Sequence, residues 1–264
     1  MATVRDIYRY IDSVAPFATQ EDFDNAGFLV GRGGATVKTA LVALDITPRT
    51  AEEAAQLGAQ LIVSHHPVIF QPLRAVTDGS VTGSIVLSLA ERGIAAVCAH
   101  TNLDAAQGGV NDCLAAALGL SGVELLTAGG VDGAGRPYGI GRVGMIDGTM
   151  TAGEFAAFVK ERLGASGVRV EDAGKSVRRV AVGGGACGDM LADAASAGCD
   201  TFVTADVKYH TYLEANAIGI NLLDAGHFPT ENVVVEPLTD GLRAAFPDVK
   251  FIKSAVHCEI FSTV

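Results

Sequence analysis

The chain repeats one order of predicted elements at a fixed distance along its sequence. Residues 40–66 align without gaps with residues 180–206, at an offset of 140 positions. Both stretches read as an apolar strand, an alanine-faced helix, a glycine that ends the helix (Gly58 or Gly198) and a second apolar strand. The repeat predicts an α/β fold of two similar, interlinked lobes, each a mixed sheet flanked by helices, which we interpret as an internal duplication.

Composition suggests where the lobes divide. Glycines are frequent from Thr127 to Gly141, which is typical of a boundary. We therefore expect a first lobe over residues 1–126, completed by residues 225–264, and a second lobe over residues 127–224. The metal site described below is expected between the loops that follow the strands.

Histidines and carboxylates follow three of the predicted strands. Leu61–Val63 is followed by Ser64, His65 and His66, and Ile94–Cys98 is followed by His100 and Asp104. The third strand, Ile218–Leu223, is followed by His227 and Glu231, which align with His100 and Asp104 at an offset of 127. The change of offset from 140 to 127 requires a deletion in the second copy. Open α/β sheets bind ligands at the carboxyl ends of their strands, so these residues predict a metal site.

The donor types indicate the kind of metal. Adjacent histidines at a strand end tend to point apart, which suits two ions better than one, and a shared carboxylate can hold such ions ~3.5–4 Å apart. Nitrogen and oxygen donors without a thiolate fit Zn, Fe, Mn, Co or Ni and do not choose among them. None of the five cysteines forms a Cys-x-x-Cys pair, so we expect buried thiols and a cytoplasmic, reducing environment.

Charge and hydropathy exclude other classes. The formal net charge of −11 disfavours binding to nucleic acid or to anionic membranes. We find no apolar run near the ~20 residues that span a membrane. The hydrophobic content of 49% is that of a globular protein.

Four features keep alternative interpretations open. The polar turn at residues 24–31 is either structural or functional. The glycine-rich turn at Gly183–Gly185 lacks the Lys-Ser/Thr of a Walker loop, so it either turns the backbone tightly near the site or binds phosphate. His210 is a proton relay, a residue behind the ligands or structural. His257, in an apolar terminal strand, is expected in the core or at an interface.

At these residues the sequence resembles the GTP cyclohydrolase I type 2-like family, also described as NIF-three-like dinuclear metal-centre proteins. The resemblance covers essentially the whole chain. It departs from the family at Phe23, where tryptophan is common, and at Ala205, where glycine is usual. The motifs that carry it are Asp24-Asn25-Ala-Gly27-Phe-Leu-Val-Gly31, Ser64-His65-His66-Pro67, Ala99-His100-Thr-Asn-Leu-Asp104, Thr204-Ala-Asp206-Val-Lys-Tyr209-His210 and Ala225-Gly226-His227-Phe-Pro-Thr-Glu231.

The resemblance implies a toroidal homohexamer with two metal ions in each subunit. It places the metal ligands at His65, His66, Asp104, His227 and Glu231, with Glu231 as the bridging carboxylate, and it makes His100 a further site histidine. We expect a hydrolase in which metal-activated water attacks a nucleotide or related small molecule, with His100 or His210 as proton relay. The alternative is a ring protein that binds, stores or delivers metal without catalysis.

Overall fold

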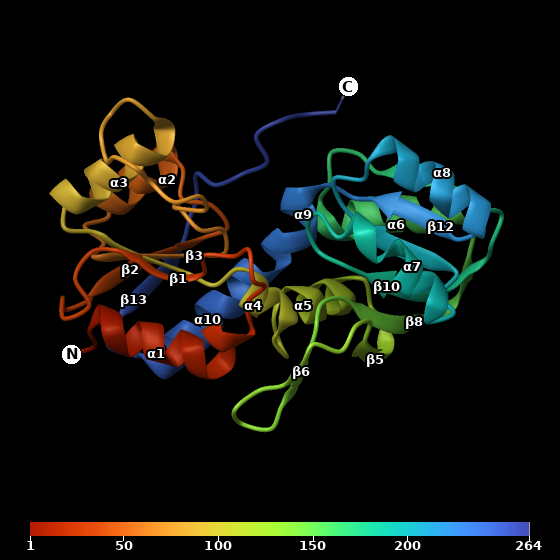
Figure 1. Cartoon of the computed structure of the whole chain (residues 1–264), viewed down its shortest axis with the longest axis horizontal. Helices are drawn as coiled ribbons and strands as arrows, with labels where there is room; N and C mark the ends of the chain where they lie inside the picture. Colours follow the sequence, from red (N-terminus) through yellow and green to blue (C-terminus); the bar gives the residue numbers. More distant parts are fainter. Residues whose placement is uncertain (264) are drawn as a thin grey trace. The chain divides into compact units, whose positions relative to one another are not determined.

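The computed structural model describes residues 1–263, which form two compact units (Figure 1). The first unit comprises Met1–Leu103 and Val235–Cys258, and the second comprises Asp104–Val234 and the residues from Glu259 on. These boundaries differ from those of the predicted lobes. The main reason is that α5 (Val110–Ala117) and β5 (Ser121–Leu125) belong to the second unit, because both contact β8 (Arg142–Met150) of the second sheet.

The first unit is built on a five-stranded sheet in the order β1-β4-β3-β2-β13. β1 is antiparallel to β4, and the other neighbours are parallel. Every residue of β3 and β4 is buried, as expected for central strands covered on both faces. The strands are β1 (Gly27–Val30), β2 (Thr39–Ala43), β3 (Leu61–Ser64), β4 (Ala95–Cys98) and β13 (Lys250–Lys253).

Helices cover both faces of this sheet, with α2 (Pro48–Gln56) and α3 (Val81–Glu91) on one side and α1 (Val4–Val14) and α10 (Val235–Ala245) on the other (Figure 1). Thr47 caps α2 through its side chain, and Pro48 is the first residue of the helix, where its missing N–H costs nothing. Alanine and leucine side chains of α2 and α3 pack on the sheet and form one apolar core with it.

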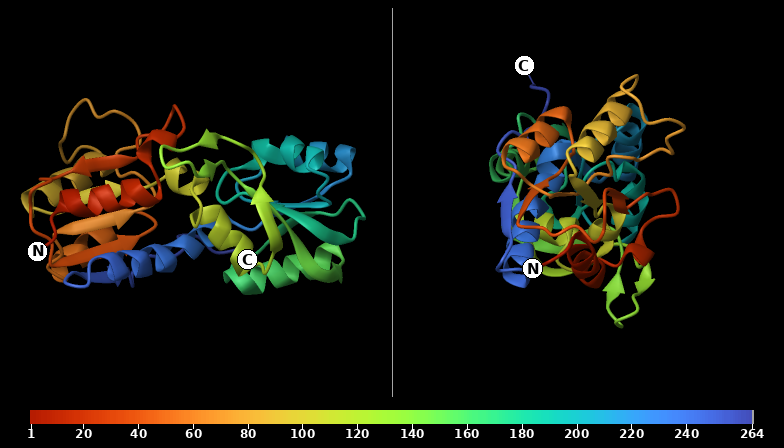
Figure 2. Two further views of the ribbon diagram at one scale, coloured as in Figure 1. Left: turned by 90° about the horizontal axis from the view of Figure 1, so that it is seen from below. Right: turned by 90° about the vertical axis from the view of Figure 1, so that its left-hand side faces the viewer.

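The second unit is built on a six-stranded sheet in the order β5-β8-β10-β11-β12-β9, whose three central strands β10, β11 and β12 are parallel. α7 (Leu191–Ser196) and α8 (Tyr209–Ile218) cover one face, and α5 and α6 (Ala152–Leu163) cover the other (Figure 2). The remaining strands are β8 (Arg142–Met150), β9 (Arg169–Glu171), β10 (Val177–Val182), β11 (Thr201–Thr204) and β12 (Asn221–Asp224).

The two sheets share the register that the repeat predicts. Ala40 pairs with Leu61 across β2 and β3, and Val180 pairs with Thr201 across β10 and β11, so that each partner is displaced by 140 positions. The next two pairs along these strands keep the same offset. The mixed α/β fold class is thereby confirmed.

One strand begins later than the sequence indicates. The apolar run Tyr138–Ile146 predicts a single strand, but β8 begins at Arg142, and Tyr138 belongs to a hairpin of β6 (Gly130–Val131) and β7 (Pro137–Tyr138). Gly141 has φ +73° and so breaks the extended backbone between the two strands.

Within residues 1–263, no helix has the length and apolar character needed to cross a membrane.

Candidate metal centre

Three histidines gather at one edge of the first sheet. His65 and His66 follow β3, and His100 lies two residues beyond β4, whose end pairs with that of β3. Each ring offers a nitrogen within 4.8 Å of the nitrogens of the other two. His65 is buried, while His66 and His100 are partly exposed. Neighbouring parallel strand ends therefore bring these predicted site residues together, as expected.

Each of these rings is oriented through its Nδ1 atom. A carbonyl or carboxylate oxygen only accepts, so each Nδ1 carries the proton and Nε2 is the lone-pair nitrogen of the neutral ring. This arrangement is typical of metal-binding histidines, whose other nitrogen donates to an acceptor behind them. The Nδ1 contacts are His65 to Ala99 O (2.8 Å), His66 to Asp45 Oδ1 (2.7 Å) and His100 to Asp24 Oδ1 (2.8 Å).

Asp24 supports the functional interpretation of the polar turn at residues 24–31. Its side chain is fully buried and accepts hydrogen bonds from His100 Nδ1, from the Thr101 hydroxyl and from the Thr101 amide. Burial alone would raise the pKa of Asp24, but the hydrogen bonds from His100 and Thr101 outweigh it and lower the pKa to about 2. Asp24 is therefore an ionised acceptor that holds His100 in place.

The lowered pKa of Asp24 predicts a loss of stability in acid. An ordinary aspartate has a pKa near 3.8, so ionised Asp24 stabilises the fold above about pH 4, and this contribution disappears as the pH falls to about 2. The difference corresponds to about 2 kcal/mol. Urea unfolding from pH 2 to pH 6 should show it in the wild type and not in Asp24→Asn. Curves that stay parallel over this range would refute the prediction, and exposed Asp22→Asn is the matched control.

Asp45 holds two histidines at once. Its Oδ1 accepts from His66 Nδ1 at 2.7 Å, and its Oδ2 lies 2.9 Å from His257 Nε2. Burial would raise the pKa of Asp45, but the hydrogen bonds from His257 and His66 hold it well below its usual range. The expectation for His257 is corrected in its place in the chain, because His257 lies beyond β13 and in no strand. Its side chain is buried, as expected for a core residue, and it supports the carboxylate behind His66.

The second unit contributes two further candidate ligands, both on the short helix α9 (His227–Glu231). His227 and Glu231 are one turn apart on the same face, and His227 Nε2 lies 3.1 Å from Glu231 Oε2. His227 Nδ1 lies 2.7 Å from Asp206 Oδ2, so this ring also presents Nε2 as its lone-pair nitrogen. A lone-pair nitrogen facing a carboxylate oxygen at this distance favours a cation or a proton between them.

Asp206 occupies a strained position. Its φ is +52°, a left-handed conformation that no other non-glycine residue adopts among residues 1–263. It aligns with His66 in the repeat and lies two residues beyond the end of β11. Backbone strain of this kind is common at functional sites, and here it directs a carboxylate toward His227.

The glycine turn at Gly183–Gly185 lies against Glu231. A Cβ atom at Gly185 would lie 2.0 Å from Glu231 Oε1 and 3.3 Å from His227 Nε2. The Gly184 amide donates to Asn111 Oδ1 (2.9 Å), and Asn111 Nδ2 donates to the carbonyl of Asp104 (3.0 Å). This supports the interpretation that the glycines let the backbone turn tightly beside the ligands.

The donor set fits a divalent ion of nitrogen and oxygen preference. Asp104, in α4 (Thr101–Ala105), and Glu231 are buried carboxylates. Burial, together with the charges of Asp104 and Glu231, raises the pKa of the nearby Cys187 thiol far above its usual range, so that Cys187 is a neutral thiol when no cation is bound. The groups that could hold an ion consist of imidazoles and carboxylates, a donor set suited to Zn, Fe, Mn, Co or Ni.

The orienting carboxylates are the functional residues that sequence reasoning missed. Asp24 and Asp206 lie inside motifs that the family resemblance identifies, so the sequence could have indicated both. Asp45 lies outside these motifs. His210 belongs to neither cluster. It lies on α8 and lines a pocket beside Asp206.

Comparison with known proteins places these features in a family context. A model of Duf34/NIF3 (NGG1p interacting factor 3) matches residues 2–259. A protein of Streptomyces coelicolor named GTP cyclohydrolase 1 type 2 homolog is 39% identical over 236 residues, 88% of this chain and 82% of its own length. Its namesake in Clostridium perfringens is 33% identical over 253 residues, 95% of both chains. A Bacillus cereus protein related to NIF3 has a crystal structure with a TM-score of 0.93 and 27% identity, covering 100% of this chain and 99% of its own.

Proposed function

Because the chain belongs to the Duf34/NIF3 family, we propose that it is a dinuclear metal-dependent hydrolase acting on a nucleotide or related small molecule. The proposal assigns His65, His66, Asp104, His227 and Glu231 as ligands of two divalent ions, with Glu231 shared. The observation that carries it is the common orientation of four imidazoles. In each, Nδ1 is held by an oxygen acceptor and Nε2 is the lone-pair nitrogen.

Chain connectivity supports the assignment of both clusters to one centre. His100 directly precedes α4, and Asp104 lies within that same short helix. The chain therefore passes from the histidines of the first unit to a carboxylate of the second within four residues. Glu231 and His227 follow on α9, where the i,i+4 spacing keeps both on one helix face.

The chemistry proposed for the site is hydrolysis. Divalent ions, when bound, lower the pKa of a coordinated water to about 7 and so supply a nucleophile at neutral pH. His100 is assigned as the proton relay, because Asp24 fixes its tautomer and stabilises the imidazolium that forms when Nε2 takes up a proton. The name of the relatives, GTP cyclohydrolase 1 type 2 homolog, favours a guanine nucleotide as substrate, attacked at the base or at phosphorus.

Elemental analysis followed by an activity screen tests this function. We expect about two divalent ions per chain in the purified protein and a clear loss of metal in Glu231→Ala. Metal-replete wild type should then turn over a nucleotide or phosphoester that Glu231→Ala does not. If wild type and variant are equally inactive across the screen, hydrolysis is refuted. Readily exchangeable metal in that case favours the alternative function of metal storage or delivery.

We also propose that the chain assembles as a toroidal hexamer, which the family resemblance implies. Native mass spectrometry should then find six chains of 27.1 kDa in the principal species. A monomer at micromolar concentration would contradict this assembly.

A further inference from the structure

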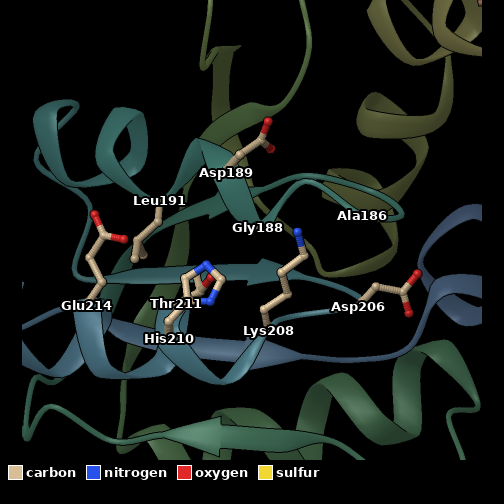
Figure 3. Close-up of a pocket in the computed structure, with 9 residues that line it drawn as sticks. All are labelled: Ala186, Gly188, Asp189, Leu191, Asp206, Lys208, His210, Thr211 and Glu214. Carbon is tan, nitrogen blue, oxygen red and sulfur yellow. The ribbon is translucent and has the colours of Figure 1, made fainter.

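The second unit contains a polar pocket that the proposed metal ligands do not use. It has a volume of about 440 Å³, within the range of small-molecule sites. The pocket lies between the segment around Gly188 and the start of α8 (Figure 3). Its charged or ionisable lining consists of Asp189, Asp206, Lys208, His210 and Glu214.

One residue belongs both to the pocket and to the ligand cluster. Asp206 lines the pocket, and its Oδ2 lies 2.7 Å from Nδ1 of His227. Lys208 is two residues further along the chain, and its amino group extends toward the segment around Gly188 (Figure 3). The end of the pocket at Asp206 and Lys208 is thus the end nearest to His227.

The two ends of the pocket carry different groups. Lys208 lies beside Asp206, whose carboxylate already accepts from His227, whereas Glu214 lies at the far side, beyond His210 (Figure 3). Within residues 1–263, the side chains of Lys208, His210 and Glu214 form no hydrogen bond or ion pair with another residue. These groups are therefore available to a ligand whose ends differ in charge.

We propose that this pocket binds the organic part of a phosphorylated substrate whose far end carries N–H donors. Lys208 and His210 contact the phosphate at the end near His227, and Glu214 accepts from the donor edge. A guanine base suits this end because its ring N–H and exocyclic amine are parallel donors that match one carboxylate. The assignment rests on the proposed function, and it places phosphorus rather than the base at the metal centre.

Three related compounds separate the two contacts. GMP carries both groups, guanosine lacks the phosphate, and IMP lacks the exocyclic amine. Saturation-transfer NMR titrations with the full-length, metal-replete protein give a dissociation constant for each, and the same spectra report whether GMP is consumed. We expect GMP to bind roughly tenfold more tightly than IMP, the effect of one charge-assisted hydrogen bond, and at least about tenfold more tightly than guanosine, which loses every contact of the phosphate.

Two variants assign each preference to its residue. Lys208→Met should reduce the preference for GMP over guanosine, and Glu214→Gln should reduce the preference for GMP over IMP. Lys160→Met and Glu161→Gln, both at exposed positions on α6, are the matched controls. The pocket assignment is overturned if GMP does not bind, or if Lys208→Met and Glu214→Gln bind all three compounds as their controls do.

The same experiment distinguishes this assignment from the proposed function. GMP binding that depends on Lys208 and Glu214, without turnover of any nucleotide or phosphoester, leaves the pocket in place and refutes hydrolysis. Turnover with a KM unchanged in both variants refutes the pocket and leaves hydrolysis in place.

Discussion

A Gly185→Ala variant should lose metal from the cluster of His227 and Glu231 and unfold at a lower temperature than the wild type. Gly185 has φ +67°, which costs an alanine about 1–2 kcal/mol. The new Cβ atom would also lie 2.0 Å from Glu231 Oε1, so the carboxylate must move. Loss of a residue behind a ligand lowers metal affinity about 10–100-fold, and displacement of the ligand itself should exceed that.

Metal affinity by competition with a chelator, together with thermal unfolding, checks this result. Gly164→Ala is the matched control, because Gly164 has φ +63° and its added Cβ atom meets nothing within 4 Å. Both variants place an alanine at a positive φ and lose stability for that reason, whereas only the Cβ atom of Gly185→Ala clashes with Glu231. Equal metal affinity in the two variants would show that the glycine turn does not position this carboxylate.

Asp45→Asn should weaken metal binding about 10–100-fold while leaving the fold intact, because it disturbs the acceptor behind His66. Asp45 accepts from both His66 and His257, and an asparagine in its place presents a donor to one of them. The rings then change tautomer or turn, and Nε2 of His66 is no longer held in one direction. Affinity measured by chelator competition, with circular dichroism to verify folding, provides the readout.

His257→Ala extends this test of the Asp45 contacts. It leaves Asp45 its hydrogen bond with His66 and removes the second donor, so its effect should be smaller than that of Asp45→Asn. Exposed Asp78→Asn serves as the control for the loss of one negative charge in the same unit. If Asp45→Asn binds metal as tightly as Asp78→Asn, Asp45 has no part in orienting His66.

The sequence predicted the sheets better than the loops between them. The repeat relates strands that are buried on both faces, so the apolar runs of β3 and β11 identify them directly. β8 was placed four residues early, because Tyr138 continues the apolar pattern while Gly141 interrupts the backbone. Apolar patterning reports burial, and it does not report the conformation of a single glycine.

For the candidate site, sequence reasoning found histidines at the strand ends and missed most of the groups that orient them. Strand ends of one parallel sheet meet by topology, so grouping His65, His66 and His100 required only the order of elements. Their partners come from elsewhere in the chain. Asp24 is 76 positions from His100, and His257 is 212 positions from Asp45, and no local pattern relates such pairs.

The division of the chain into units has a consequence for the order of synthesis. Residues 104–234, most of the second unit, leave the ribosome before the strand that completes the first sheet. That strand, β13, pairs with β2 more than two hundred residues earlier, at Lys250 and Thr39. Since domains tend to fold as they emerge, the inner segment is free to fold early, while the earlier residues wait for β13. Chains shortened before Lys250 should therefore keep a structured second unit and expose the open edge of β2 to aggregation.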